Sequence, residues 1–113
     1  MCDKNGQAGK FGKHLIFNVS NLIDYNDGIN IINKIVKEID MTPIHDLIIN
    51  YKNDTNFDLV QLIAESHISI HRLNNKIIVD VFSCKNFDET KVVQLFENKI
   101  SNIKLINRGI YYK

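Results

Sequence analysis

Residues 67–82, with the sequence HISIHRLNNKIIVDVF, predict a β-hairpin around which the fold of this chain can be built. The first five positions alternate polar and apolar side chains, which is the period of a half-buried strand. The two asparagines at 74–75 favour a tight turn, because asparagine tolerates left-handed dihedral angles. Residues 76–82 are rich in β-branched side chains and predict the second strand. The polar residues of the first strand should therefore share one face of a sheet.

Apolar runs on both sides of this hairpin predict further strands. They cover residues 14–19, 44–51, 59–63 and 103–106. Gly109 is expected to end the last of them. A polar segment at 52–56 predicts the turn between the second and third of these runs.

Two segments have apolar residues at helical spacing. The first covers about residues 29–39 and should end before Pro43, which lacks an amide donor. The second covers about residues 89–100, with Asp88 as its N-cap. Each helix has one apolar side to bury, so we expect an α+β fold: a two-layer sandwich in which an antiparallel sheet carries both helices on one face.

Length, charge and cysteine content narrow the class of protein. The 113 residues suit one domain, expected over residues 12–113 after a flexible N-terminal tail at 1–11. A net charge of +1 without a basic patch predicts neither nucleic acid nor a membrane surface as partner. No apolar run approaches the roughly 20 residues of a membrane span, and no signal peptide is recognisable. Cys2 and Cys84 are too few for a disulfide scaffold; we expect no disulfide between them and a cytoplasmic protein.

Reactive side chains gather around the start of the hairpin. They are Glu65, Ser66, His67, Ser69, His71 and Cys84. The predicted two-residue turn would bring Cys84 back beside Ser66. Taken singly, such residues are more often polar surface or, for cysteine, small buried side chains. No metal site is expected, since His67 and His71 lack a third ligand at a recognised spacing.

Residues 64–71, AESHISIH, resemble the processing site of the prokaryotic S-adenosylmethionine decarboxylase family. Residues 79–84, VDVFSC, resemble the next block of that family. Its first and last strands are similar to residues 12–15, GKHL, and 107–109, NRG. The resemblance covers about residues 12 to 109, and the eight-residue match around Ser66 is its most specific part.

The resemblance implies an autocatalytic zymogen, cleaved between Glu65 and Ser66. Ser66 would become a pyruvoyl cofactor, which forms a Schiff base with the substrate. By position, His71 would assist processing and Cys84 would donate or accept a proton during turnover. The family further implies a lyase of polyamine (spermidine) biosynthesis and a homodimer of cleaved αβ protomers, with active sites shared across the interface.

Three departures from the family pattern concern substrate contacts. Asn18 stands where the family usually has an acidic residue, and Asn75 replaces the family's ribose-binding glutamate. Asp58 occupies the position of a serine implicated in processing, and could bind an ammonium or guanidinium group. We therefore assign Asp58, Asn75 and Asn18 to substrate binding.

These departures leave three hypotheses open. The first hypothesis is a pyruvoyl-dependent decarboxylase that acts on S-adenosylmethionine, because this is the most frequent substrate in the family. The alternatives are a related pyruvoyl-dependent decarboxylase of L-ornithine or L-arginine, and an uncleaved homologue that regulates a partner enzyme.

Overall fold

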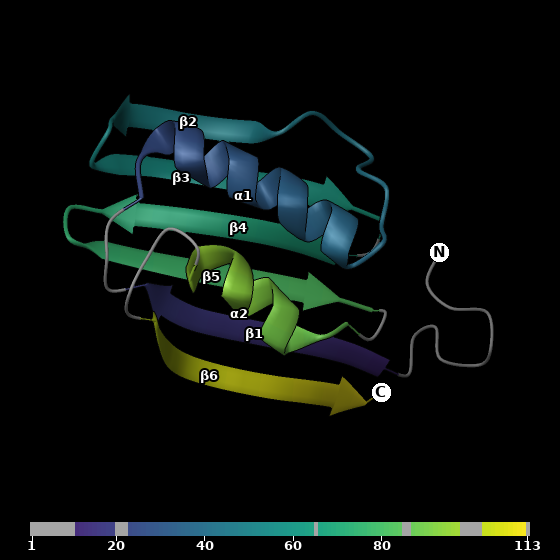
Figure 1. Ribbon diagram of the computed structural model, residues 1–113. Helices are drawn as coiled ribbons and strands as arrows, with labels where there is room; N and C mark the ends of the chain where they lie inside the picture. Colours follow the sequence, from purple (N-terminus) through teal and green to yellow (C-terminus); the bar gives the residue numbers. More distant parts are fainter. Residues whose placement is uncertain (1–10, 20–22, 65, 85–86, 98–102, 113) are drawn as a thin grey trace.

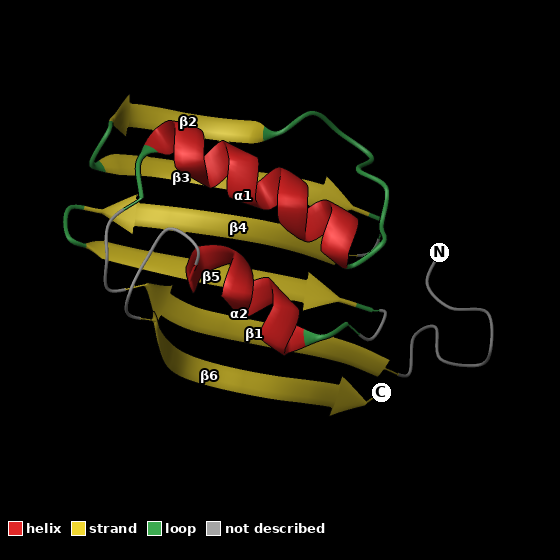
Figure 2. Cartoon of the chain, in the orientation of Figure 1, coloured by secondary structure: helices red, strands yellow, loops and turns green. Residues whose placement is uncertain are grey.

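The computed structural model describes residues 11–19, 23–64, 66–84, 87–97 and 103–112, which form a sheet covered on one face by two helices (Figure 1). In chain order the elements are β1 (Phe11–Val19), α1 (Tyr25–Glu38), β2 (Ile48–Asn53), β3 (Asn56–Ile63), β4 (Ser66–Leu73), β5 (Lys76–Ser83), α2 (Glu89–Glu97) and β6 (Ile103–Tyr112). The six strands are ordered β2-β3-β4-β5-β1-β6, and all neighbours are antiparallel. The predicted α+β two-layer sandwich is confirmed (Figure 2).

The β4–β5 hairpin has the predicted two-residue turn. Asn74 adopts a left-handed conformation, with φ of 55°, and Leu73 pairs with Lys76. This register continues along both strands and sets His67 opposite Phe82. Because side chains alternate between the two faces of a strand, the register decides which residues of β4 and β5 share a face.

The hydrophobic core lies between the sheet and the two helices. Helix α1 begins after Asp24, whose carboxylate accepts a hydrogen bond from the N–H of Asp27 at 2.8 Å. The helix approaches the sheet so closely at Gly28 that a Cβ there would lie 2.9 Å from Cδ1 of Leu59. The predicted N-cap of α2 is confirmed, since Asp88 accepts from the N–H of Thr90 at 3.0 Å.

Several element ends differ from their predictions. β2 begins at Ile48 rather than at 44. Before it, Pro43 forms only an isolated bridge with Ile63, and the carbonyl of His45 accepts from the Gln61 side chain. β6 continues past Gly109, which pairs with His14, since the neighbouring strand β1 supplies partners for it as far as Tyr112. β1 begins at Phe11, inside the predicted tail, and residues 1–10 of that tail lie outside the described residues.

The sheet face opposite the helices, called the outer face below, is covered by neither of the two described helices (Figure 1). It carries alternate residues of five strands: Ile48 and Asn50; Asp58, Val60 and Leu62; His67, Ser69 and His71; Ile78, Asp80 and Phe82; and His14, Ile16 and Asn18. Neither described helix is long and apolar enough to cross a membrane.

Candidate active site

Ser66 and Cys84 lie together where the β4–β5 hairpin ends. Ser66 is the first residue of β4, and Cys84 directly follows β5. The Ser66 hydroxyl donates to Cys84 Sγ at 3.7 Å, and the backbone N–H of Cys84 donates to Ser66 Oγ at 3.2 Å. Both residues are buried, with exposed fractions of 5% and 6%. The predicted proximity of these two residues is confirmed, because the tight turn aligns the far ends of both strands.

Cys84 is disulfide-bonded in this structure, to a partner outside the described residues. The expectation of no disulfide, which rested on the polar N-terminal sequence around Cys2, is therefore contradicted at Cys84. A disulfide sulfur has no proton to exchange, so any acid–base role of Cys84 requires the reduced form.

His71 lies on the outer face and pairs with Asp58. Its Nδ1 is 2.7 Å from Asp58 Oδ1, and the Asn50 side-chain amide donates to Asp58 Oδ2 at 3.1 Å. The hydrogen bond with His71 lowers the pKa of Asp58, partial burial opposes this, and the Asn50 hydrogen bond adds to the lowering. An ionised carboxylate can only accept, so Nδ1 of His71 is the donor. Nε2 is then the nitrogen of His71 that can exchange a proton with another group.

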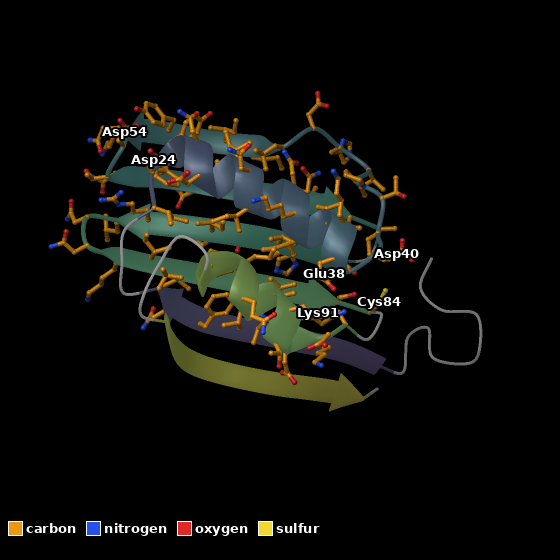
Figure 3. All side chains as sticks on the ribbon, in the orientation of Figure 1. Asp24, Glu38, Asp40, Asp54, Cys84 and Lys91 are labelled. Carbon is orange, nitrogen blue, oxygen red and sulfur yellow. The ribbon has the colours of Figure 1, made fainter. Side chains whose placement is uncertain are left out.

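Ser66 and His71 do not meet within one chain. They are five positions apart on β4, roughly 17 Å at the usual rise per residue of a strand. Their side chains also lie on opposite faces, since Ser66 is buried on the helix side, whereas 47% of the His71 side chain is exposed on the outer face. Figure 3 shows the same separation of the sheet ends, with Cys84 at one and Asp54, in the β2–β3 turn, at the other.

The residues assigned to substrate binding lie at the His71 end of the sheet. Asn50, Asp58, His71, Ile78 and Asn18 form one row across five strands. Asn75 is in the β4–β5 turn at the same end. An open hollow of about 620 Å³ lies over part of this row; its lining includes Asn50, Asp58, His71, Lys76 and Ile78. Asn18 and Asn75 do not line it.

Sequence reasoning left His14 without a role and considered His67 only as a metal ligand. Within the described part of the chain, no group of three His, Cys, Asp or Glu side chains could hold a metal ion. His14 and His67 instead flank Asp80 on the outer face. The hairpin turn could have indicated part of this arrangement, because a two-residue turn at 74–75 sets Asp80 opposite Ser69, next to His67 on the same face.

The structure is thus a small two-layer α+β sandwich with a buried serine at the start of a central strand. The sequence model of the family described as S-adenosylmethionine decarboxylase matches residues 14–108. The chain therefore belongs to the S-adenosylmethionine decarboxylase family, a family of decarboxylases.

One solved structure supports the fold independently. The crystal structure of the adenosylmethionine decarboxylase from Aquifex aeolicus VF5 is similar to this chain with a TM-score of 0.64 and 21% sequence identity. The match covers 92% of this chain and 91% of that chain. No curated protein matches this chain in sequence.

Proposed function

We propose that this chain is a pyruvoyl-dependent decarboxylase of polyamine biosynthesis that makes its cofactor by cutting itself between Glu65 and Ser66. The observation that carries the proposal is the contact between Ser66 Oγ and Cys84 at the start of β4. Family membership supports the reaction class. The contact supports the chemistry, because it holds a hydroxyl nucleophile out of water with a hydrogen-bond donor beside its oxygen.

In the proposed cleavage, Ser66 Oγ bonds to the carbonyl carbon of Glu65 and the peptide C–N bond breaks, which leaves an ester. Loss of the Cα proton of residue 66 then expels the Glu65 carboxylate and leaves a dehydroalanine. One water replaces its nitrogen, which departs as ammonia. The N–H of Cys84 would stabilise negative charge on the serine oxygen during the attack. Glu65 itself lies outside the described residues.

The surroundings of Ser66 fit a pyruvoyl group. That position is buried, begins a central strand and has the Cys84 N–H as a donor. When formed, the group supplies a ketone that condenses with the substrate's amine and takes up the electrons released with carbon dioxide. Cys84 would return a proton to the carbon that loses its carboxylate. This role requires a thiol, which the predicted cytoplasmic location would favour.

We further propose a homodimer of cleaved αβ protomers in which each copy completes the other's site. The argument is the separation of Ser66 from His71 on opposite faces of one sheet. If His71 assists at Ser66, it must come from another copy. A twofold dimer would satisfy this requirement twice, because the same surface of each copy contributes.

S-adenosylmethionine is the substrate that family membership favours. A basic amino acid, ornithine or arginine, is the second candidate, and Asp58 is the residue that favours it. Its carboxylate is ionised, lies in the hollow and has a side chain that is 43% exposed. It could attract an ammonium or guanidinium group in addition to its bonds with His71 and Asn50.

Intact-protein mass spectrometry and a decarboxylation assay test these proposals. We expect two polypeptides: residues 1–65, and a chain from residue 66 that is lighter than its sequence by one ammonia. Release of labelled carbon dioxide from S-adenosylmethionine, ornithine and arginine, measured side by side, identifies the substrate. An intact chain would contradict the proposal, and its co-purification with an active decarboxylase would support a regulatory homologue instead.

Cys84→Ala is expected to be cut like the wild type but to turn over about 10²–10⁴-fold more slowly, because it lacks the proposed proton donor. The measurement is kcat of the cleaved enzyme under a thiol reductant. Cys2→Ala is the matched control, since it removes the other cysteine and should keep full activity. Equal kcat values for Cys84→Ala and the wild type would exclude this role.

A further inference from the structure

Four side chains from three neighbouring strands form a cluster on the outer face, close to the proposed cleavage site. They are His67 of β4, Asp80 and Phe82 of β5, and His14 of β1. Asp80 Oδ1 lies 2.5 Å from His14 Nε2 and 3.6 Å from His67 Nε2. The Phe82 ring stacks on His67 at a centroid distance of 6.0 Å and meets the edge of His14 at 5.9 Å.

The cluster holds His67 from two directions. Burial tends to raise the pKa of Asp80, but His67 and His14 outweigh it, so that this pKa lies below its usual range. Asp80 is therefore an anion, to which His14 must donate. The hydrogen bond from His14 fixes the carboxylate, Nε2 of His67 lies 3.6 Å from the same carboxylate oxygen, and Phe82 supports the His67 ring from one side.

Cleavage would change what holds this end of β4. In the uncut chain, residues 64 and 65 connect β3 to β4, and Ser66 pairs with Ile63 across that connection. Cutting after residue 65 removes the connection and turns residue 66 into a chain end. Chain ends fray unless something ties them down. The pyruvoyl group would sit on that very residue, so fraying would move the reacting atoms.

We propose that His67, held by Asp80 and Phe82, is a positioning residue that keeps residue 66 in place after the chain has been cut. His14 contributes by fixing Asp80. This inference rests on the proposed self-cleavage and adds a part that acts after it. An exposed ion pair alone would contribute little, but His67 is the residue adjacent to the new chain end, and its ring is also stacked.

The test compares one substitution in a cut and an uncut chain. His67→Ala and Asp80→Asn are each made in the wild-type background and in a Ser66→Ala background, where the connection to β3 persists. Amide hydrogen exchange of residues 67–70 is then measured. We expect at least about tenfold faster exchange in the cut background and little change in the uncut one. In the cut enzymes we expect kcat to fall by about tenfold or more, with KM changed less, because small displacements of a reacting group are costly.

Asp54→Asn is the matched control, since Asp54 is a hydrogen-bonded carboxylate in the β2–β3 turn, at the other end of the sheet. It should change neither exchange nor kcat. If His67→Ala remains uncut, Asp80→Asn supplies the comparison. Equal changes of amide exchange in both backgrounds, or an unchanged kcat, would overturn this inference but leave the proposed self-cleavage in place. A wild-type chain that stays intact would overturn the proposed cleavage, and this inference with it.

Discussion

Ser66→Ala is expected to remain a single chain of 113 residues with no decarboxylase activity above background. The methyl group has no oxygen to attack the carbonyl of Glu65, so neither the ester nor the ketone can form. The loss should be complete rather than partial, because no other residue can supply the cofactor. A denaturing gel and the intact mass report whether the chain is cut, and the release of labelled carbon dioxide reports the activity.

The stability of the Ser66→Ala variant must be measured as well. Removing the hydroxyl deletes the hydrogen bond from the Cys84 N–H to Ser66 Oγ, and one such bond contributes about 0.5–1.5 kcal/mol of folding free energy. Ser69→Ala is the matched control: it lies on the same strand, is 6% exposed, and should be cut and active. Cleavage of Ser66→Ala at the same bond would refute the proposed nucleophile.

The β4–β5 hairpin is the part of the fold that can be predicted best from sequence, for a physical reason. A two-residue turn of asparagines leaves one register for the strands, and the alternation of polar and apolar residues then sets the faces. The proximity of Ser66 and Cys84 follows from that register. Element ends are less predictable, because they depend on partners elsewhere. Gly109 weakens a strand locally, yet β6 continues through it since β1 lies alongside.

The pairings of the two candidate histidines depend on residues distant in sequence. His71 meets Asp58 through the register of β3 with β4. The sequence pattern relates Asp58 to a processing serine and to substrate binding, but not to His71. Asp80 meets His14 because β1 inserts between β5 and β6, a topology that local patterns do not report. The alternation does predict that Ser66 and His71 face opposite ways. It takes the structure, however, to show that β4 pairs continuously with β3 and β5, so that no bend of the strand brings Ser66 and His71 together.

That separation leads to a prediction about pairs of inactive chains. Ser66→Ala and His71→Ala, each expressed alone, should both stay uncut and inactive. Co-expressed with different tags, they should form mixed dimers in which Ser66 of the His71→Ala chain meets His71 of the Ser66→Ala chain. The His71→Ala chain should then be cut, and activity should return to about a quarter of the wild-type value, since half of the dimers carry one intact site of two.

The tags make this result decisive, because only the His71→Ala chain can be cut when it has a suitable partner. Co-expression of His71→Ala with a Ser66→Ala/His71→Ala double variant is the control and should restore nothing. Cleavage of His71→Ala on its own would show that His71 is not needed for processing. A mixed dimer that forms but stays uncut would show that His71 does not act from the other copy. The proposed active site shared between two copies would then be excluded.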